Sequence, residues 1–221
     1  MMNNLFSTFD PATSMKMSMN WLSSIMCLMI MPLYYWKLKN RIEIMINLTM
    51  KNLHKEFKTL MSKNSNNMTL MMISLFTMIM LNNMMGLLPY IFTSSSHLLF
   101  TMTLALPLWI SLMMFGWFNK TNYMFSHLIP MSTPTPLIPF MVVIETISNF
   151  IRPGSLAVRL TANMIAGHLL MTLLGNSMIE SKMKTLIFLF QMTLMMIEMA
   201  VALIQAYVFS ILTTLYYSEV M

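Results

Sequence analysis

The chain has 221 residues, of which 57% are hydrophobic and only 9% are charged. Its 13 Lys and Arg outnumber its 7 Asp and Glu, but so few charged groups cannot cover the surface of a soluble globule. The composition therefore excludes a soluble globular protein and indicates a membrane protein with several spans. The single cysteine, Cys27, excludes a disulfide framework and leaves the cellular compartment open.

The first membrane span is expected at residues 21–36. The residues before it lack the basic segment and small-residue cleavage site of a removable signal, so none is expected. Aromatic side chains, which favour the membrane interface, bracket the apolar segment at both ends: Trp21, Tyr34, Tyr35 and Trp36. Pro32 predicts a bend where the helix leaves the membrane.

A basic loop follows at residues 37–63, with seven Lys or Arg side chains against only Glu43 and Glu56. This excess predicts that the loop lies on the inner side of the membrane. Apolar residues recur through it at helical spacing, which predicts an amphipathic helix on the membrane surface: Ile42, Ile46, Met50, Leu53, Phe57 and Leu60. The flanking spans and the lack of interleaved aromatic residues argue against nucleic-acid binding.

Residues 64–119 contain no Asp, Glu, Lys or Arg, and their length allows two spans of about 20 residues each. We place these spans near residues 68–88 and 98–118, joined by a short outer turn that contains Pro89, Tyr90 and three consecutive serines. Three residues of the first span are expected to pack against or bond to neighbouring helices: Asn82, Asn83 and Gly86.

The remainder of the chain is expected to form a steeply inclined helical hairpin. Its first arm, residues 140–174, would be about 52 Å long as a helix, whereas the hydrocarbon core of a membrane is about 30 Å thick. The arm must therefore tilt or bend, and Pro153-Gly154 is the obvious place for a bend. After a turn at residues 175–184, a second arm of the same excess length is expected at residues 185–217.

The first arm carries polar side chains inside apolar sequence. Spacings of 4, 3, 4, 3 and 4 place one set on a single stripe of a helix: Glu145, Asn149, Arg152, Leu156, Arg159 and Asn163. His168 is rotated by about 180° from Arg159, so a straight helix presents polar groups on two sides. Two polar surfaces separated by one helix suggest two aqueous routes.

Each arginine in a membrane span needs compensation, because its insertion costs about 2.5–3.5 kcal/mol. A static ion pair of Glu145 with either Arg152 or Arg159 is one interpretation. This ion pair leaves the other arginine without a compensating negative charge, because the stretch contains a single acid. The two arginines are also expected to differ: Arg152 precedes Pro153, where a bend can turn its side chain toward an interface, whereas Arg159 lies two turns deeper.

The second arm carries Glu198 as its one acid inside apolar sequence, with Ala202, Gln205 and Phe209 on the same face. The small side chains of Ala202 and Ala206 suit the close passage of another helix. A simpler role for Gln205, a bond to a neighbouring backbone, stays an alternative.

No catalytic centre, metal site or cofactor is expected. The sequence lacks metal-ligand spacing, a glycine-rich phosphate loop and a pairing of nucleophile with base. The histidines are scattered over separate predicted elements: His54, His97, His127 and His168.

Four stretches that together cover most of residues 82–207 carry a family resemblance. They are NNMMGLLPY at 82–90, HLIPMSTPTPLIPFMVVIE at 127–145, SNFIRPGSLAVRLTANMIAGHLL at 148–170 and EMAVALIQAY at 198–207. These stretches resemble subunit a of the F-type ATP synthases in its animal mitochondrial form. The RPGSLAVRLTANMIAGH run is highly specific, whereas residues 1–63 match only loosely, through NLFSTFDP and the pattern of a span followed by a surface helix.

The resemblance implies a proton-translocating stator subunit that faces a rotating ring of c subunits, each with an essential carboxylate. Arg159 would separate two offset half-channels, since arginine is always protonated and never passes a proton through itself. The resemblance also assigns the other site residues: His168 and Glu198 to the half-channel from the intermembrane space, Glu145 and Asn163 toward the matrix side, and Gln205 near Arg159. Arg152 and Asn149 are secondary candidates.

The expected organisation is an N-terminal span and basic surface helix at residues 1–63, a transmembrane helix pair at 64–119, and a proton-conducting hairpin at 120–221. The resemblance implies that the chain lies in the mitochondrial inner membrane, with the loop at residues 37–63 on the matrix side. The expected partners are the c-subunit ring, other stator subunits including the peripheral stalk, lipid and protons, and no nucleic acid.

Two other function classes remain as alternatives. A secondary ion transporter would place its substrate site at broken helices between repeated halves, but this sequence shows no internal repeat. A non-conducting structural membrane subunit would not need two arginines in its spans. Proton flux through reconstituted membranes, with and without the c ring, discriminates among the three functions.

Overall fold

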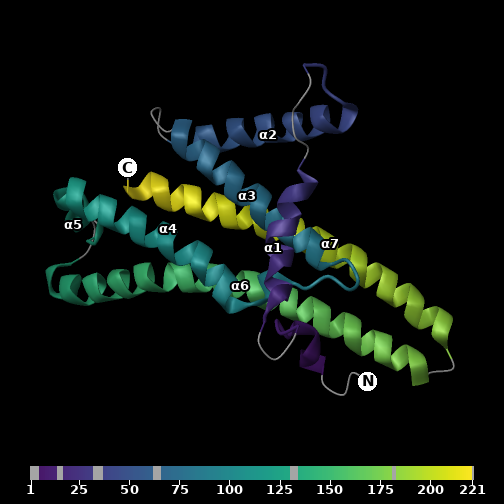
Figure 1. The fold of residues 1–221 in the computed structure, drawn as a ribbon. Coiled ribbons are helices and arrows are strands. Elements are labelled where there is room, and N and C mark those ends of the chain that lie inside the picture. Colours follow the sequence, from purple (N-terminus) through teal and green to yellow (C-terminus); the bar gives the residue numbers. More distant parts are fainter. Residues whose placement is uncertain are drawn as a thin grey trace.

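Helices are the only regular elements in the described part of this computed structural model, which comprises residues 5–13, 17–31, 37–61, 66–129, 134–180 and 183–220. The α-helices are α1 (Ser23–Met26), α2 (Arg41–Leu60), α3 (Asn66–Gly86), α4 (Leu98–Asn119), α5 (Thr121–His127), α6 (Ile138–Glu180) and α7 (Lys184–Val220). Short 3-10 helices accompany them: η1 (Leu5–Phe9), η2 (Met19–Leu22), η3 (Cys27–Ile30), η4 (Ser94–Ser96) and η5 (Thr135–Leu137). Among the described helices α3, α4, α6 and α7 are long and apolar enough to cross a membrane, which confirms the predicted all-α membrane fold (Figure 1).

The described part of the predicted first span is short. The elements η2, α1 and η3 follow one another from Met19 to Ile30 and form one apolar helical stretch about 22 Å long. This length is less than the hydrocarbon core of about 30 Å. Pro32 and the aromatic group at the expected exit lie outside the described residues.

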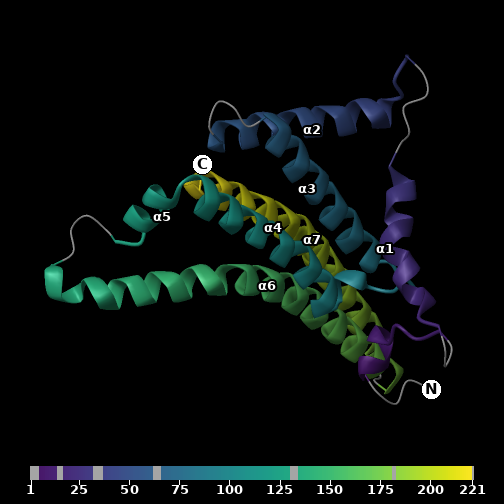
Figure 2. The same cartoon turned by 60° about the vertical axis from the view of Figure 1, so that its left-hand side comes forward.

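α2 confirms the helix predicted within the basic loop. The backbone N–H of Asn40 donates to the Glu43 carboxylate at 3.1 Å, which satisfies a backbone group that the start of a helix leaves free. A buried cluster joins the end of α2 to α3 and α7: Phe57, Met61, Met72 and Tyr217. α2 thus lies across one end of the molecule, at an angle to the long helices, as Figures 1 and 2 show.

α3 and α4 confirm the predicted pair of spans, but the link between them differs from a simple exposed turn. Ser94, Ser95 and Ser96 of η4 are all buried. The Ser94 hydroxyl donates to the side-chain oxygen of Asn82 on α3 at 3.3 Å, and the hydroxyls of Thr93 and Ser96 lie 2.9 Å apart. These bonds satisfy hydroxyl and amide groups that water would otherwise contact. The polar link can therefore be buried against the helices.

α6 and α7 form the predicted long hairpin. α6 is a single helix of 43 residues that runs through Pro153 and curves near its middle (Figure 2). The turn expected at residues 175–184 was wrong in its start, because α6 continues through Gly175 to Glu180 and α7 begins at Lys184. An isolated glycine costs a helix only about 1 kcal/mol, so Gly175 alone does not end it.

The four long helices share one core, which fixes the segment of α6 around residue 159 against its neighbours. Its buried residues are Ile79 of α3, Ala105 and Leu108 of α4, Leu156, Ala157 and Leu160 of α6, and Ala206 and Phe209 of α7. Ala202 and Ala206 have no exposed surface, as the close passage predicted for α7 requires. The Asn83 amide of α3 donates to the Ala202 carbonyl at 3.4 Å and ties the two helices together.

Replacing Ile79 with Ala should lower the free energy of unfolding by about 2–4 kcal/mol, because truncating a core side chain that is 1% exposed leaves a cavity. The matched control is Leu70→Ala on the same helix, where the side chain is 69% exposed, and its loss should stay below about 0.5 kcal/mol. Unfolding of the purified chain in detergent, followed by circular dichroism, measures both. Equal losses in the two variants would contradict this core.

Candidate functional site

Arg152 on α6 is held by two acids and an aromatic ring. Its guanidinium lies 3.7 Å from the carboxylate of Glu145, which is two turns earlier on the same face of α6. It also donates a hydrogen bond to the carboxylate of Glu219, near the end of α7, and lies 5.1 Å from the centre of the Tyr216 ring. The ion pair of Glu145 with Arg152, one of the two pairings considered from the sequence, is therefore present, and Arg152 joins the two arms of the hairpin.

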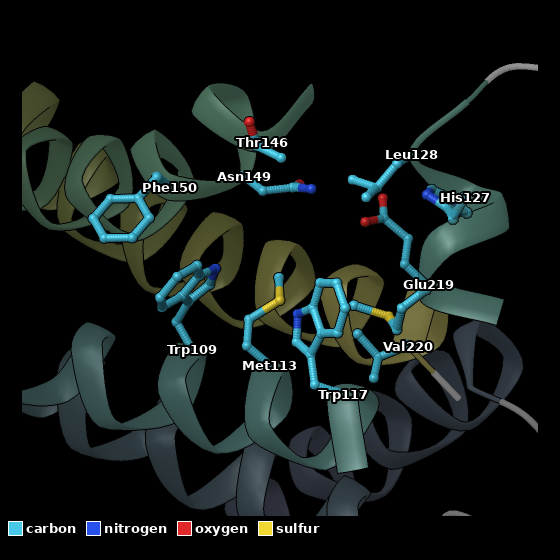
Figure 3. Close-up of a pocket in the computed structure, with 11 residues that line it drawn as sticks. Trp109, Met113, Trp117, His127, Leu128, Thr146, Asn149, Phe150, Glu219 and Val220 are labelled. Atoms are coloured by element: carbon cyan, nitrogen blue, oxygen red, sulfur yellow. The ribbon is translucent and has the colours of Figure 1, made fainter. Parts of the chain in front are cut away.

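A pocket of about 260 Å³ lies beside this cluster, lined by α4, α5, α6 and α7. Figure 3 shows the Asn149 amide and the Glu219 carboxylate pointing toward each other across it. Thr146 and His127 add further polar groups to an otherwise apolar and aromatic lining. The indole N–H of Trp109 is buried here without a hydrogen-bond partner among the described residues. The pocket has both the room and the polar groups that water requires.

Arg159 lies two turns further along α6, and its surroundings are the opposite of those of Arg152. Its side chain is exposed, and it makes no hydrogen bond or ion pair within the described part of the chain. Exposed residues with small side chains surround it on the same side of the helix: Ser155, Ala162 and Ala166. Because α6 is a candidate membrane span, this guanidinium requires a partner or water from outside the chain.

His168 of α6 and Glu198 of α7 meet at a small cavity of about 10 Å³. The imidazole Nε2 and the carboxylate Oε1 are buried, and neither has a hydrogen-bond partner among the described residues. A cavity of about 10–15 Å³ is large enough for one water molecule, which can bridge two such groups. The two residues that the sequence separates by a hairpin therefore line one site.

Gly167 permits this close approach of the two helices. A Cβ atom at this position would lie 2.8 Å from Cδ and 2.9 Å from Oε1 of Glu198, which is closer than real Cβ contacts. Any side chain here would have to displace the carboxylate or separate the helices. Our sequence reasoning did not single out Gly167, although a glycine directly before a polar residue in a membrane helix is the available signal.

Asn163 lines the cavity together with His168 and Glu198. Asn163 and His168 are about 140° apart around the helix, and both border the cavity because Gly167 between them has no side chain. The place of Asn163 toward the matrix side, which the family resemblance implies, stays a prediction.

Gln205 makes no hydrogen bond to another described residue, and it is half-buried. Its neighbour Ala206 packs in the same core cluster as Leu160, which is next to Arg159 in sequence. No hydrogen bond joins Gln205 to Arg159 in the described chain. The support for the expected proximity of Gln205 to Arg159 is therefore indirect, and comes from the shared core cluster of their neighbours Ala206 and Leu160.

Glu219 was missing from the expected site, although it completes the Arg152 cluster. From the sequence, the two arginines were matched only with the acid in their own stretch, Glu145. Glu219 lies outside that stretch, because it follows Arg152 by 67 residues. In a hairpin of two long arms, the second arm runs back along the first, so its end returns toward the first half of the first arm. Glu219 is the only acid in the sequence near that end. The need for a second negative charge, combined with the hairpin topology, could therefore have identified Glu219 as a partner for an arginine.

The chemistry open to these groups is proton exchange around a fixed positive charge. Imidazole and carboxylate groups accept and release protons, whereas a guanidinium keeps its charge. Along α6, the Arg152 cluster lies before Arg159 and the His168 cavity lies after it. Among the described residues, no group of three or more His, Cys, Asp or Glu side chains is arranged to hold a metal ion.

Comparison with known proteins finds full-length relatives. The family model for the ATP synthase A chain matches residues 17–218. The chain is 58% identical to ATP synthase subunit a of Aedes aegypti over 225 residues and 58% identical to that of Locusta migratoria over 224 residues. It is 56% identical to ATP synthase subunit a of Drosophila melanogaster over 223 residues. In each of these matches, both chains are covered completely.

Replacing Gly167 with Val should loosen the contact between α6 and α7, because the new side chain occupies the place of the Glu198 carboxylate. Gly175→Val is the matched control on the same helix, since no neighbouring atom lies within 4 Å of its Cβ position. Hydrogen–deuterium exchange should show faster exchange of backbone amides around residues 167 and 198 in the first variant only. Unchanged exchange in Gly167→Val would refute the close contact.

Proposed function

The chain belongs to the ATP synthase A chain family, and from this membership we propose that it is the proton-conducting stator subunit of the synthase's membrane sector. It delivers protons to the carboxylates of a rotating ring of c subunits, and receives them back, through two offset half-channels. Arg159 separates these half-channels, and proton flow past it drives rotation and ATP synthesis. The observation that carries this proposal is the exposed guanidinium of Arg159, which has no partner among the described residues and lies in a helix long and apolar enough to cross a membrane.

The cost of placing an arginine in the membrane requires a partner for Arg159 from outside the chain. Insertion of an arginine costs about 2.5–3.5 kcal/mol, and no described residue offsets it. One carboxylate at about 4 Å, with an effective dielectric constant of about 20, contributes about 4 kcal/mol, which matches that cost. A ring of carboxylates supplies such partners one after another, and the small residues around Arg159 leave room for a helix to pass.

Arginine suits this role because it stays protonated at all relevant pH values. Its charge favours the ionised form of an arriving carboxylate and so expels the proton. It does not itself carry a proton from one half-channel to the other. Protons that enter by one route therefore leave by the other only after the ring has turned.

The half-channel from the intermembrane space passes His168 and Glu198, with Asn163 beside them. Their shared cavity, with one unpaired atom on each titratable group, supports a relay through a bridging water. The half-channel to the matrix passes the pocket lined by Asn149 and Glu219, next to Glu145. The C-terminal end of α7 lies near α2, and η1 lies at the opposite end of the molecule (Figures 1 and 2).

The basic segment that contains α2 sets the orientation, since an excess of Lys and Arg marks the inner side of a membrane. We therefore place α2 on the matrix side of the mitochondrial inner membrane. The c ring, other stator subunits and the peripheral stalk are the expected protein partners. The subunit carries no catalytic centre of its own in this account and needs no cofactor.

Replacing Arg159 with Ala should abolish ATP synthesis, because the fixed charge that empties each ring carboxylate is lost. Passive proton conductance should rise, since nothing then separates the half-channels. Arg159→Lys should be a poor substitute, because a lysine is strongly hydrated and can lose its proton when buried. ATP synthesis and proton leak in membranes that contain the assembled complex measure these effects.

Arg152→Gln is the matched control on the same helix and should be milder, because the charge of Arg152 is balanced inside the chain by Glu145 and Glu219. The amount of assembled complex must be equal in all variants. Near-normal coupled synthesis in Arg159→Ala would remove this residue from the mechanism.

A further inference from the structure

The N-terminal segment packs against His168. Phe9, the last residue of η1, places the centre of its ring 6.3 Å from the centre of the imidazole, with the ring planes at 86°. This edge-to-face arrangement is one that aromatic rings favour. Figure 2 shows the N-terminal segment against the second half of α6, and residues of η1 and α6 are in contact.

Hydrogen bonds hold this segment in a defined turn. The Thr8 hydroxyl donates to the Leu5 carbonyl at 3.1 Å and stabilises η1. The side-chain amide of Asn20 in η2 donates to the carbonyl of Asp10 at 3.1 Å and ties the segment to the first apolar helix. Phe9 is thus presented to His168 by an anchored turn.

His168 depends on packing for its orientation. Among the described residues the imidazole makes no hydrogen bond, its Nε2 is buried, and the residue lines a cavity together with Glu198. A histidine ring without a hydrogen bond is free to turn about its side-chain bonds, which exchanges the positions of its two nitrogens. The perpendicular ring of Phe9 packs against the imidazole and restricts that rotation.

We propose that Phe9 is a positioning residue for proton transfer: its ring packs edge-to-face against the His168 imidazole and limits the rotation of that ring beside the cavity shared with Glu198. The inference rests on the proposed role of His168 in the outer half-channel. Phe9 touches no proton itself and acts only through His168. Phe6 of the same turn is 67% exposed and provides a matched control.

The test compares Phe9→Leu, Phe9→Tyr, Phe6→Leu and His168→Ala in membranes that contain the assembled complex. ATP synthesis per assembled complex gives the functional readout. Modification of histidines by diethyl pyrocarbonate, resolved by mass spectrometry, reports how well His168 is covered. His97 is an internal reference because, among the described residues, its ring contacts are with Trp21 and Phe92 and not with Phe9.

Phe9→Leu should slow synthesis roughly tenfold, because the imidazole no longer points at its partner, and should raise the modification rate of His168 severalfold. The reaction of His97 should not change. Phe9→Tyr keeps the ring and should restore both readouts, and Phe6→Leu should leave both unchanged.

Two results would overturn the inference while the proposed function stands. In the first, His168→Ala blocks synthesis but Phe9→Leu changes neither synthesis nor modification. In the second, Phe9→Leu and Phe9→Tyr fail alike with His168 still protected, which marks a purely structural role. Normal synthesis in His168→Ala would instead remove His168 from the proton route, and the positioning role of Phe9 with it.

Discussion

A positive charge that the described part of its own chain does not neutralise is the constraint on which the rest of this structure depends. Arg159 sits on a long apolar helix, exposed and without a partner among the described residues. On either side of it in sequence, Leu156, Ala157 and Leu160 are buried in the shared core. The core thus fixes the backbone at this point while the guanidinium remains available to a partner from outside. A subunit that only held others together would gain nothing from such a charge.

The polar groups around Arg159 depend on unusually close contacts between helices. Gly167 leaves room for the Glu198 carboxylate, and Ala202 presents its carbonyl to the Asn83 amide. Both contacts need residues with little or no side chain at the crossing. At the other end, Arg152 uses its length to reach from α6 to Glu219 on α7. The hairpin therefore brings titratable groups together at two places, one before and one after Arg159.

The sequence predicted the helices well, because long uncharged apolar segments leave few alternatives. The ends of α3 and α4 agree with the expected spans within two residues. Errors occurred where local signals competed with tertiary contacts. Gly175 was interpreted as part of a turn, although the helix passes through it, and the burial of the serines of η4 within the link was not predicted.

The candidate site was predictable in part. The meeting of His168 with Glu198 follows from a hairpin, because the two residues lie about equally far from its turn, and the structure places both at one cavity. The place of Asn163 beside them could not be derived from a helical stripe, because the cavity wraps around the side of α6 where Gly167 lacks a side chain. The pairing of Arg152 with Glu219, and the contact of Phe9 with His168, join residues that periodicity along one helix cannot relate.

The most direct test of this account is an experimental structure of the assembled membrane sector at a resolution that shows ordered water. The account predicts one chain of water that ends at His168 and Glu198, and another that ends at the pocket beside Glu219. Arg159 should stand between them and face a carboxylate of the ring. A continuous file of water past Arg159, or an ion pair of Arg159 with an acid of its own chain, would contradict it.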